Sequence, residues 1–231
     1  MKTVYLVLFD IDGTLLDSRK VGREAMKRAM EEVYGTSGPL HRYNMAGKSD
    51  RLTLRDVLTA AGLSEAVIWE RFPLYRRAFA KHLEALLQER PPFPLPGARD
   101  LVTRLSQRGD VILGLVTGNI PEGAHLKLRY AGFDPSLFRV GAYGSDALER
   151  DELPRLALER ARSSVPDVPE SIRVVVIGDT PLDIQSGHRA GARTVAVATG
   201  PYSADTLAAF HPHVLLPNLA DVSRAEAAIL S

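Results

Sequence analysis

The stretch VLFDIDGTLLDS, residues 7–18, places two aspartates two positions apart directly after an apolar run. Residues 4–9 are apolar without a break and rich in branched side chains, which is typical of a strand buried on both faces. Because side chains at positions i and i+2 of a strand point the same way, Asp10 and Asp12 can reach one small volume. The glycine and threonine that follow favour a tight, hydrogen-bonded turn.

The composition excludes several classes of protein. The chain has 231 residues, 45% of them hydrophobic, and a formal net charge of +1, so a strong field for nucleic acid or a membrane surface is not expected. The absence of cysteine excludes disulfides, thiolate metal sites and cysteine nucleophiles, and favours a cytoplasmic location. No apolar run approaches the roughly 18 residues of a membrane span, and the opening MKTVYLVLFD is better explained by a buried strand than by a signal peptide.

Further apolar segments alternate with helical patterns along the chain. Strands are expected at residues 4–9, 111–116, 138–142, 173–177, 194–198 and, as a short sixth, 213–216. Helices are expected at residues 98–108, 124–131, 152–162, 184–190 and 205–210. This alternation predicts an α/β fold, a Rossmann-like parallel sheet covered by helices on both faces.

Residues 19–93 differ from the rest of the chain. They contain helical patterns, including a long one at 68–87, and the first shows Val21, Ala25 and Val33 on one face. The segment PPFPLPG, residues 91–97, then marks a change in composition. We therefore expect a core formed by residues 1–18 and 94–231, with an α-helical cap domain inserted at 19–93.

Polar side chains follow several of the expected strands, and ligands of open parallel sheets bind at the carboxyl ends of strands. They are Asp10 and Asp12, then Thr117, Gly118 and Asn119, then Arg150, and finally Asp179 and Asp183. Carboxylates packed this closely repel one another, and oxygen ligands alone favour a hard cation such as Mg²⁺. One opening aspartate could act as a nucleophile and the other as a general acid and base.

The remaining groups suit a phosphate. Thr117 offers a hydroxyl, Gly118 and Asn119 could form a nest of backbone N–H groups, and Arg150 could balance charge on a transferring phosphoryl group. Arg155 is the alternative to Arg150. Any one of these motifs alone is a common turn, cap or surface residue, and it is their joint order after successive strands that indicates a catalytic site.

Together, DIDGT, VTGN, the basic residue at 150 and GDTPLD resemble the haloacid dehalogenase-like hydrolase superfamily, in particular its phosphoglycolate phosphatase-like and β-phosphoglucomutase-like members with a helical cap after the first motif. The resemblance implies Mg²⁺-dependent phosphoryl transfer with Asp10 as nucleophile and Asp12 as general acid and base. It also implies a metal held by Asp10, the backbone carbonyl of Asp12, and Asp179, with Asp183 acting through water. The third motif of the family usually carries lysine, so Arg150 is a departure.

We therefore expect a phosphomonoester hydrolase that forms an aspartyl-phosphate from a small phosphorylated metabolite. A phosphomutase of the same superfamily and a non-catalytic module with the same fold are the alternatives. A dehalogenase would leave Asp12, Asp179 and Asp183 unexplained, and a phosphonate-cleaving enzyme usually lacks an acid at position 12. In the cap, Lys48 of the polar segment HRYNMAGKSD could contact the leaving group of the substrate, or could be an exposed loop residue.

Overall fold

A computed structural model describes residues 3–165 and 171–231 of the chain. Its centre is a parallel sheet of six strands in the order β5-β4-β1-β6-β7-β8. The strands are β1 (Tyr5–Phe9), β4 (Val111–Thr117), β5 (Val140–Tyr143), β6 (Arg173–Gly178), β7 (Arg193–Val197) and β8 (Val214–Leu216). The predicted α/β fold is confirmed, and each predicted strand is present within three residues of its expected ends.

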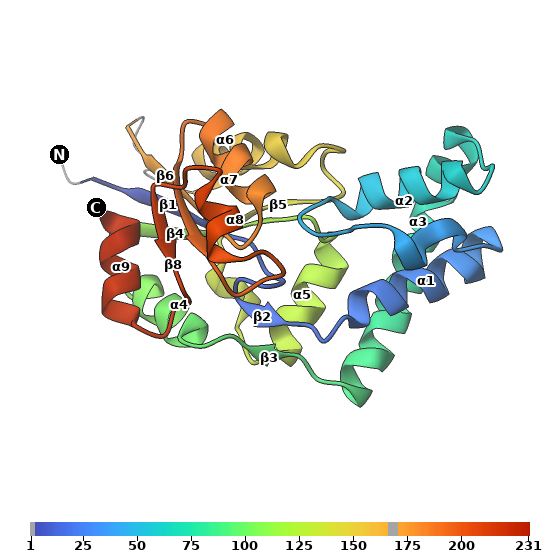
Figure 1. Cartoon of the computed structure of the whole chain (residues 1–231), viewed down its shortest axis with the longest axis horizontal. Helices are drawn as coiled ribbons and strands as arrows, with labels where there is room; N and C mark the ends of the chain where they lie inside the picture. Colours follow the sequence, from blue (N-terminus) through green and yellow to red (C-terminus); the bar gives the residue numbers. More distant parts are fainter. Residues whose placement is uncertain (1–2, 166–170) are drawn as a thin grey trace.

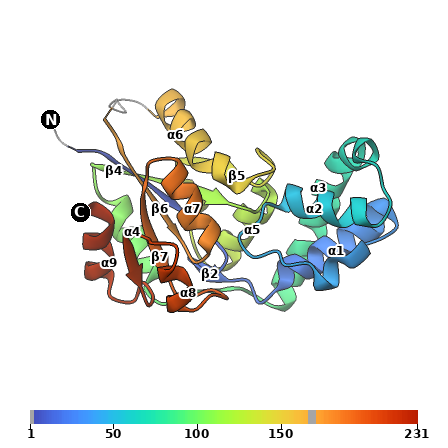
Figure 2. The ribbon, with the colours of Figure 1, turned by 45° about the horizontal axis from the view of Figure 1, so that its top comes forward.

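Helices cover both faces of this sheet (Figures 1 and 2). They are α4 (Ala98–Ser106), α5 (Pro121–Tyr130), α6 (Leu153–Ser164), α7 (Pro181–Arg189), α8 (Ala204–Ala208) and α9 (Val222–Leu230). Helices α5 and α7 begin three residues before the predicted starts, because proline occupies their first position, where no N–H partner is needed. The sequence analysis did not predict α9.

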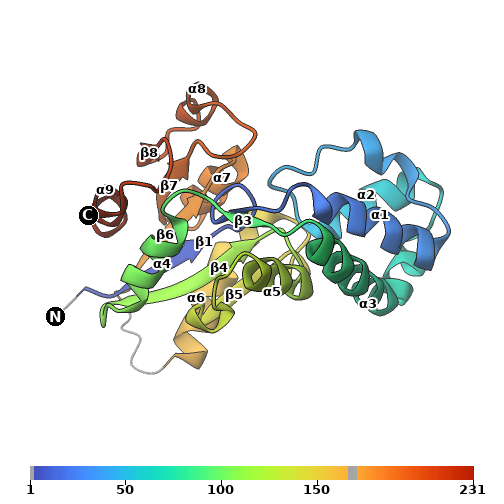
Figure 3. The same cartoon turned by 90° about the horizontal axis from the view of Figure 1, so that it is seen from below.

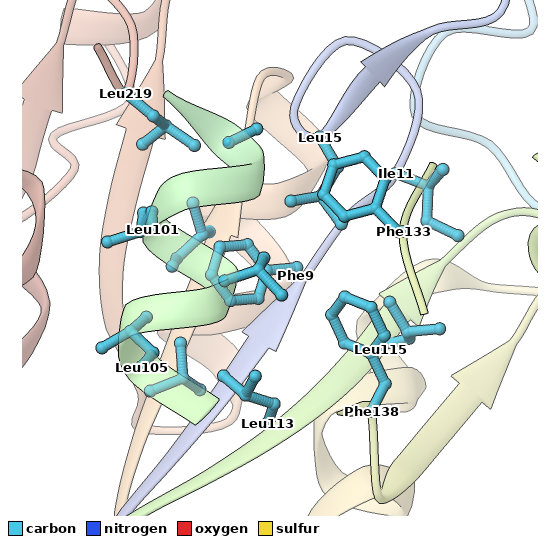
Figure 4. Close-up of a cluster of buried hydrophobic side chains, with 14 of the residues drawn as sticks. Phe9, Ile11, Leu15, Leu101, Leu105, Leu113, Leu115, Phe133, Phe138 and Leu219 are labelled. Carbon is cyan, nitrogen blue, oxygen red and sulfur yellow. The ribbon is translucent and has the colours of Figure 1, made fainter. Parts of the chain in front are cut away.

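Strand β1 is apolar throughout because both of its faces are buried. Val7 and Phe9 belong to one hydrophobic cluster, together with residues of α4, α5 and α9, whereas Leu6 and Leu8 belong to another, together with residues of α6. Figure 4 shows Phe9 in the first cluster, between helix α4 and the sheet. This double burial places β1 at the centre of the sheet and its carboxyl end, where Asp10 follows, between β4 and β6.

The segment 19–93 forms a layer of its own beyond the carboxyl ends of the strands (Figures 1 and 3). It contains α1 (Val21–Tyr34), the 3₁₀ helix η1 (Gly38–Arg42), α2 (Asp50–Ala60) and α3 (Glu65–Glu89). Their buried side chains form a separate hydrophobic cluster that also takes in Ile120 and Leu126, at the start of and within α5. The chain leaves and returns through the antiparallel strands β2 (Leu16–Asp17) and β3 (Phe93–Pro94). We interpret this arrangement as two domains. Residues 1–18 and 94–231 form the core, and residues 19–93 form the cap.

A substitution at Gly97, directly before α4, tests how tightly the chain packs where it returns from the cap to the core. The φ of Gly97 is +77°, and a Cβ at this position would lie 1.8 Å from the carbonyl oxygen of Leu219. We expect Gly97→Ala to lower the free energy of unfolding by at least about 3 kcal/mol, because a backbone clash adds to the cost of a left-handed alanine. Gly35→Ala is the matched control: its φ is +74° but nothing lies within 4 Å, so only roughly 1–2 kcal/mol is expected. Equal losses in urea unfolding would contradict this account.

Candidate active site

Three buried aspartates gather where β1 and β6 end. Asp10 follows β1, Asp179 follows β6, and Asp183 lies in the first turn of α7; one carboxylate oxygen of each lies within 4.8 Å of the other two. Burial raises the pKa of Asp10 to about 6, and burial together with the charges of Asp10 and Asp183 raises the pKa of Asp179 well above its usual value. The arrangement therefore concentrates negative charge that a cation must offset.

Glycine allows the chain to pack directly against Asp179. A Cβ at Gly13 would lie 2.4 Å from Asp179 Oδ2, and a Cβ at Gly200 would lie 1.7 Å from the same atom. The hydroxyl of Thr14 donates to Asp179 Oδ1 at 3.0 Å. The carboxylate is thus held between the turn after β1 and the turn after β7.

Arg150 lies within the aspartate cluster. It is 5% exposed, and its Nη2 lies 2.9 Å from Asp10 Oδ1 and also donates to Asp183 Oδ1. Burial alone would lower the pKa of Arg150, but the charges of Asp10 and Asp183 raise it above its usual value. The alternative from the sequence, Arg155, pairs with Glu159 on the surface. The geometry therefore favours Arg150 as the cation of the site.

Asp183 has both carboxylate oxygens engaged by the protein. Oδ1 accepts from Arg150, while Oδ2 accepts from the N–H of Thr180 at 3.0 Å and from its hydroxyl at 2.7 Å. Thr180 Oγ1 in turn accepts from the N–H of Asp183, which completes a capping box at the start of α7. Asp183 is therefore held rigidly, and its carboxylate oxygens have few lone pairs left to bind another group.

Asp12 differs from the other aspartates because it has a cationic partner of its own. Its Oδ2 accepts from Lys127 Nζ at 2.6 Å and from Asn119 Nδ2 at 2.8 Å. Burial alone would raise the pKa of Asp12, but the charge and hydrogen bond of Lys127 bring it below its usual value. Asp10 and Asp12 line one cavity of about 790 Å³, as their spacing predicts.

The last residue of β4, Thr117, and the turn after it, with Gly118 and Asn119, line the same cavity. Thr117 Oγ1 accepts from Asn119, both from its backbone N–H at 3.3 Å and from its side chain at 2.8 Å. For the predicted anion nest to form, the Asn119 N–H must break its hydrogen bond to Thr117 and donate to a phosphate oxygen instead. At Gly118, a Cβ would lie 2.1 Å from the carbonyl oxygen of Lys48, so glycine lets the cap reach this turn.

The cap contributes basic residues to the lining of the cavity. Lys48 Nζ lies 4.2 Å from the centre of the Tyr43 ring and donates to the Tyr43 hydroxyl at 2.9 Å. Lys20, Arg23 and His41 line the same cavity. Lys48 also lines this cavity. Its contact with a leaving group stays a prediction.

Two residues of the site, Lys127 and Asp50, were not predicted from the sequence. Lys127 of α5 is 4% exposed, and a charged residue between two leucines soon after the VTGN motif was the available signal. Asp50 begins α2; its side chain accepts from the N–H of Ile120 at 2.9 Å, and its own N–H donates to the carbonyl of Gly118 at 2.7 Å. Asp50 was not predicted because its role depends on this contact between cap and core, and no local sequence pattern indicates such a contact.

A family profile described as haloacid dehalogenase-like hydrolase matches residues 7–197. The chain belongs to this family. Among its relatives, pyrophosphatase PpaX of Anoxybacillus flavithermus is 26% identical, with 94% of each chain covered. A phosphoglycolate phosphatase of Rhodospirillum rubrum is 29% identical, with 87% of this chain and 82% of the relative covered.

Solved structures show the same fold. A hydrolase from Pseudomonas syringae has a TM-score of 0.71 at 23% identity and covers 99% of this chain and 100% of its own. CbbY from Rhodobacter sphaeroides, in complex with phosphate, has a TM-score of 0.70 at 22% identity over 95% of this chain and 96% of its own. The family makes the chain a haloacid dehalogenase-like hydrolase, and the relatives that it resembles are named as phosphatases. Among the helices in the described ranges, none is long and apolar enough to cross a membrane.

Asp50 gives this haloacid dehalogenase-like hydrolase a predictable dependence of stability on pH. Burial raises the pKa of Asp50 from 3.8 to about 6. Between these values the folded state holds a proton that the unfolded state has lost, so this group lowers the free energy of unfolding as pH rises. We expect Asp50→Asn to be more stable than wild type by on the order of 1–3 kcal/mol at about pH 8. The difference should shrink toward about pH 4 in urea unfolding; a difference independent of pH would contradict the assignment.

Proposed function

We propose that the chain is a Mg²⁺-dependent phosphomonoester hydrolase that acts on a small phosphorylated metabolite through an aspartyl-phosphate on Asp10. The observation that carries this proposal is the cluster of Asp10, Asp179 and Asp183, buried together beside Arg150, with Asp10 and Asp179 lining the cavity. A purely structural role would not require three buried carboxylates around one cation, because buried charges are costly unless they are paired. Phosphoryl transfer uses such groups directly.

The donor set fits Mg²⁺. The aspartate cluster offers oxygen atoms alone, which a hard cation prefers. Asp10, Asp179 and the backbone carbonyl of Asp12 would hold the ion. Asp183 would act through water, since Arg150 and Thr180 already occupy its oxygens. When bound, Mg²⁺ supplies charge that offsets the carboxylates and the phosphate oxygens.

The residues of the chain would carry out the reaction in two steps. An oxygen of Asp10 forms a bond to phosphorus while the bond from phosphorus to the leaving oxygen breaks, and Asp12 gives that oxygen a proton. Asp12 then takes a proton from water as the water attacks the aspartyl-phosphate and releases phosphate and the free carboxylate. Thr117 and Arg150 hold the phosphoryl oxygens. Lys127 favours the ionised Asp12 of the second step, whereas an anionic phosphate beside it favours the protonated form needed in the first.

The cap side of the cavity suits a leaving group that carries a second acidic group. The cations Lys20, Arg23 and Lys48 line it together with His41, and cations attract anions. The relatives named for pyrophosphate and phosphoglycolate make these two compounds first choices for a substrate panel. A phosphomutase remains the second candidate; two solved structures described as putative β-phosphoglucomutases share the fold, with TM-scores of 0.61 and 0.65. Isomerised sugar phosphate, rather than free phosphate, would identify it.

Asp10→Asn tests the nucleophile. On a panel that includes pyrophosphate, phosphoglycolate, p-nitrophenyl phosphate and benzyl phosphate, we expect wild type to release phosphate with Mg²⁺ and not with EDTA. The variant should lose more than about 10³-fold in kcat, because the attacking group is gone. Its fold should persist, and above about pH 6 its free energy of unfolding should rise, because burial raises the pKa of Asp10 to about 6 and so disfavours the charged carboxylate. Phosphate release by the variant at the wild-type rate would refute the mechanism.

Asp179→Asn tests the metal site without relying on turnover. Mg²⁺ that binds only the folded state should stabilise wild type by about 2.7 kcal/mol at a concentration of 100 times its Kd, measured by thermal unfolding. The variant should lose most of this stabilisation. Asp17→Asn is the matched control, because Asp17 lines the same cavity outside the aspartate cluster. An equal Mg²⁺ response in all three proteins would place the metal elsewhere.

A further inference from the structure

Lys127 is a buried cation beside Asp12, and the proposed reaction so far uses only its charge. Its side chain is 5% exposed, on a helix whose neighbouring leucines lie in the hydrophobic interior. Burying an ammonium group is costly unless a partner of opposite charge and further hydrogen bonds compensate. Lys127 has both, since Nζ lies 2.6 Å from Asp12 Oδ2 and 2.6 Å from Asn119 Oδ1.

Asn119 connects Lys127 to the rest of the site. Its carbonyl oxygen accepts from Lys127, which directs its amino group toward Asp12 Oδ2 at 2.8 Å and Thr117 Oγ1 at 2.8 Å. The amide therefore has one favourable orientation, and two donors converge on the same oxygen of Asp12. Charge-assisted hydrogen bonds of this kind are the strong ones, so the rotamer of Asp12 depends on them.

The cap encloses this arrangement. Gly22, in the first turn of α1, lies so close that a Cβ there would be 3.2 Å from Lys127 Nζ. Water is thereby kept from the ammonium group, and electrostatic interactions are stronger where water is excluded. Asp12 and Lys127 nevertheless both line the cavity that also contains Asp10.

We propose that Lys127 is a positioning residue, which together with Asn119 holds the Asp12 carboxylate in place for proton transfer to the leaving oxygen. The proposal rests on the proposed function, in which Asp12 exchanges that proton. Lys127 acts through Asp12 and contributes little to the binding of the phosphoryl group, which Thr117 and Arg150 hold. A misplacement of about 1 Å in a reacting group can cost about 10²-fold in rate.

A double-mutant cycle with Asp12→Asn tests this dependence. With benzyl phosphate and Mg²⁺, Lys127→Met should lower kcat about 10²-fold and change KM by less than about 3-fold. The double variant should match Asp12→Asn alone within about 3-fold, because Lys127 has nothing left to position. Multiplicative losses, or a KM effect without a kcat effect, would overturn the proposal.

The leaving group supplies a second readout that a merely structural role would not change. p-Nitrophenyl phosphate releases a stable anion that needs little help from a proton, whereas benzyl phosphate releases an alcohol. Lys127→Met should therefore lose at least about 10-fold more activity on benzyl phosphate than on p-nitrophenyl phosphate. Equal losses on both esters would overturn the proposal.

Arg129→Met is the matched control, since it removes an exposed cation from the same helix and should leave both activities unchanged. If Lys127→Met fails to fold by thermal unfolding, Lys127→Gln, which keeps a donor but no charge, replaces it in both tests. A wild-type enzyme inactive on every ester would overturn the proposed function and this proposal together. If wild type is active and the losses of the two single variants multiply in the double variant, only the proposed role of Lys127 is overturned.

Discussion

Asp10, Asp179 and Asp183 carry like charges in a space where water is scarce, and most features of the site can be understood as responses to that repulsion. Burial raises the pKa of Asp10 and Asp179, so each would take up a proton unless a cation were near. Arg150 provides one fixed cation, and the three carboxylates offer oxygen atoms, the type of ligand that a hard divalent cation prefers. The parallel sheet makes this concentration possible because the ends of β1 and β6 lie side by side.

The same groups also connect the core to the cap. Arg150, which binds Asp10 and Asp183, also donates to the carbonyl of Gly47 at 3.1 Å. Asp50 binds the turn after β4 through both its side chain and its backbone. Arg150 therefore joins the aspartate cluster to the cap at Gly47, and Asp50 joins the cap to the turn after β4.

Some residues of the site can be predicted from the sequence, and others cannot. Asp10 and Asp179 follow apolar strands and Thr117 is the last residue of one, so the rule that ligands bind at the carboxyl ends of parallel strands locates them. Arg150 was harder to assign from the sequence, because Arg155 lies in the same segment. Only the contact of Arg150 with Asp10 distinguishes the two arginines. Lys127 could not be assigned, because its partner Asp12 is 115 residues away.

The sequence by itself determined the α/β architecture, the position of the helical segment and the set of carboxylates, because apolar periodicity and residue order are local properties that reflect burial. Tertiary structure alone decided which charges meet: Arg150 with Asp10, Lys127 with Asp12, and Asp50 with the turn after β4. Electrostatic pairing depends on distances of a few ångström between residues far apart in the chain. Such distances exist only once the strands are in register and the cap lies against the core.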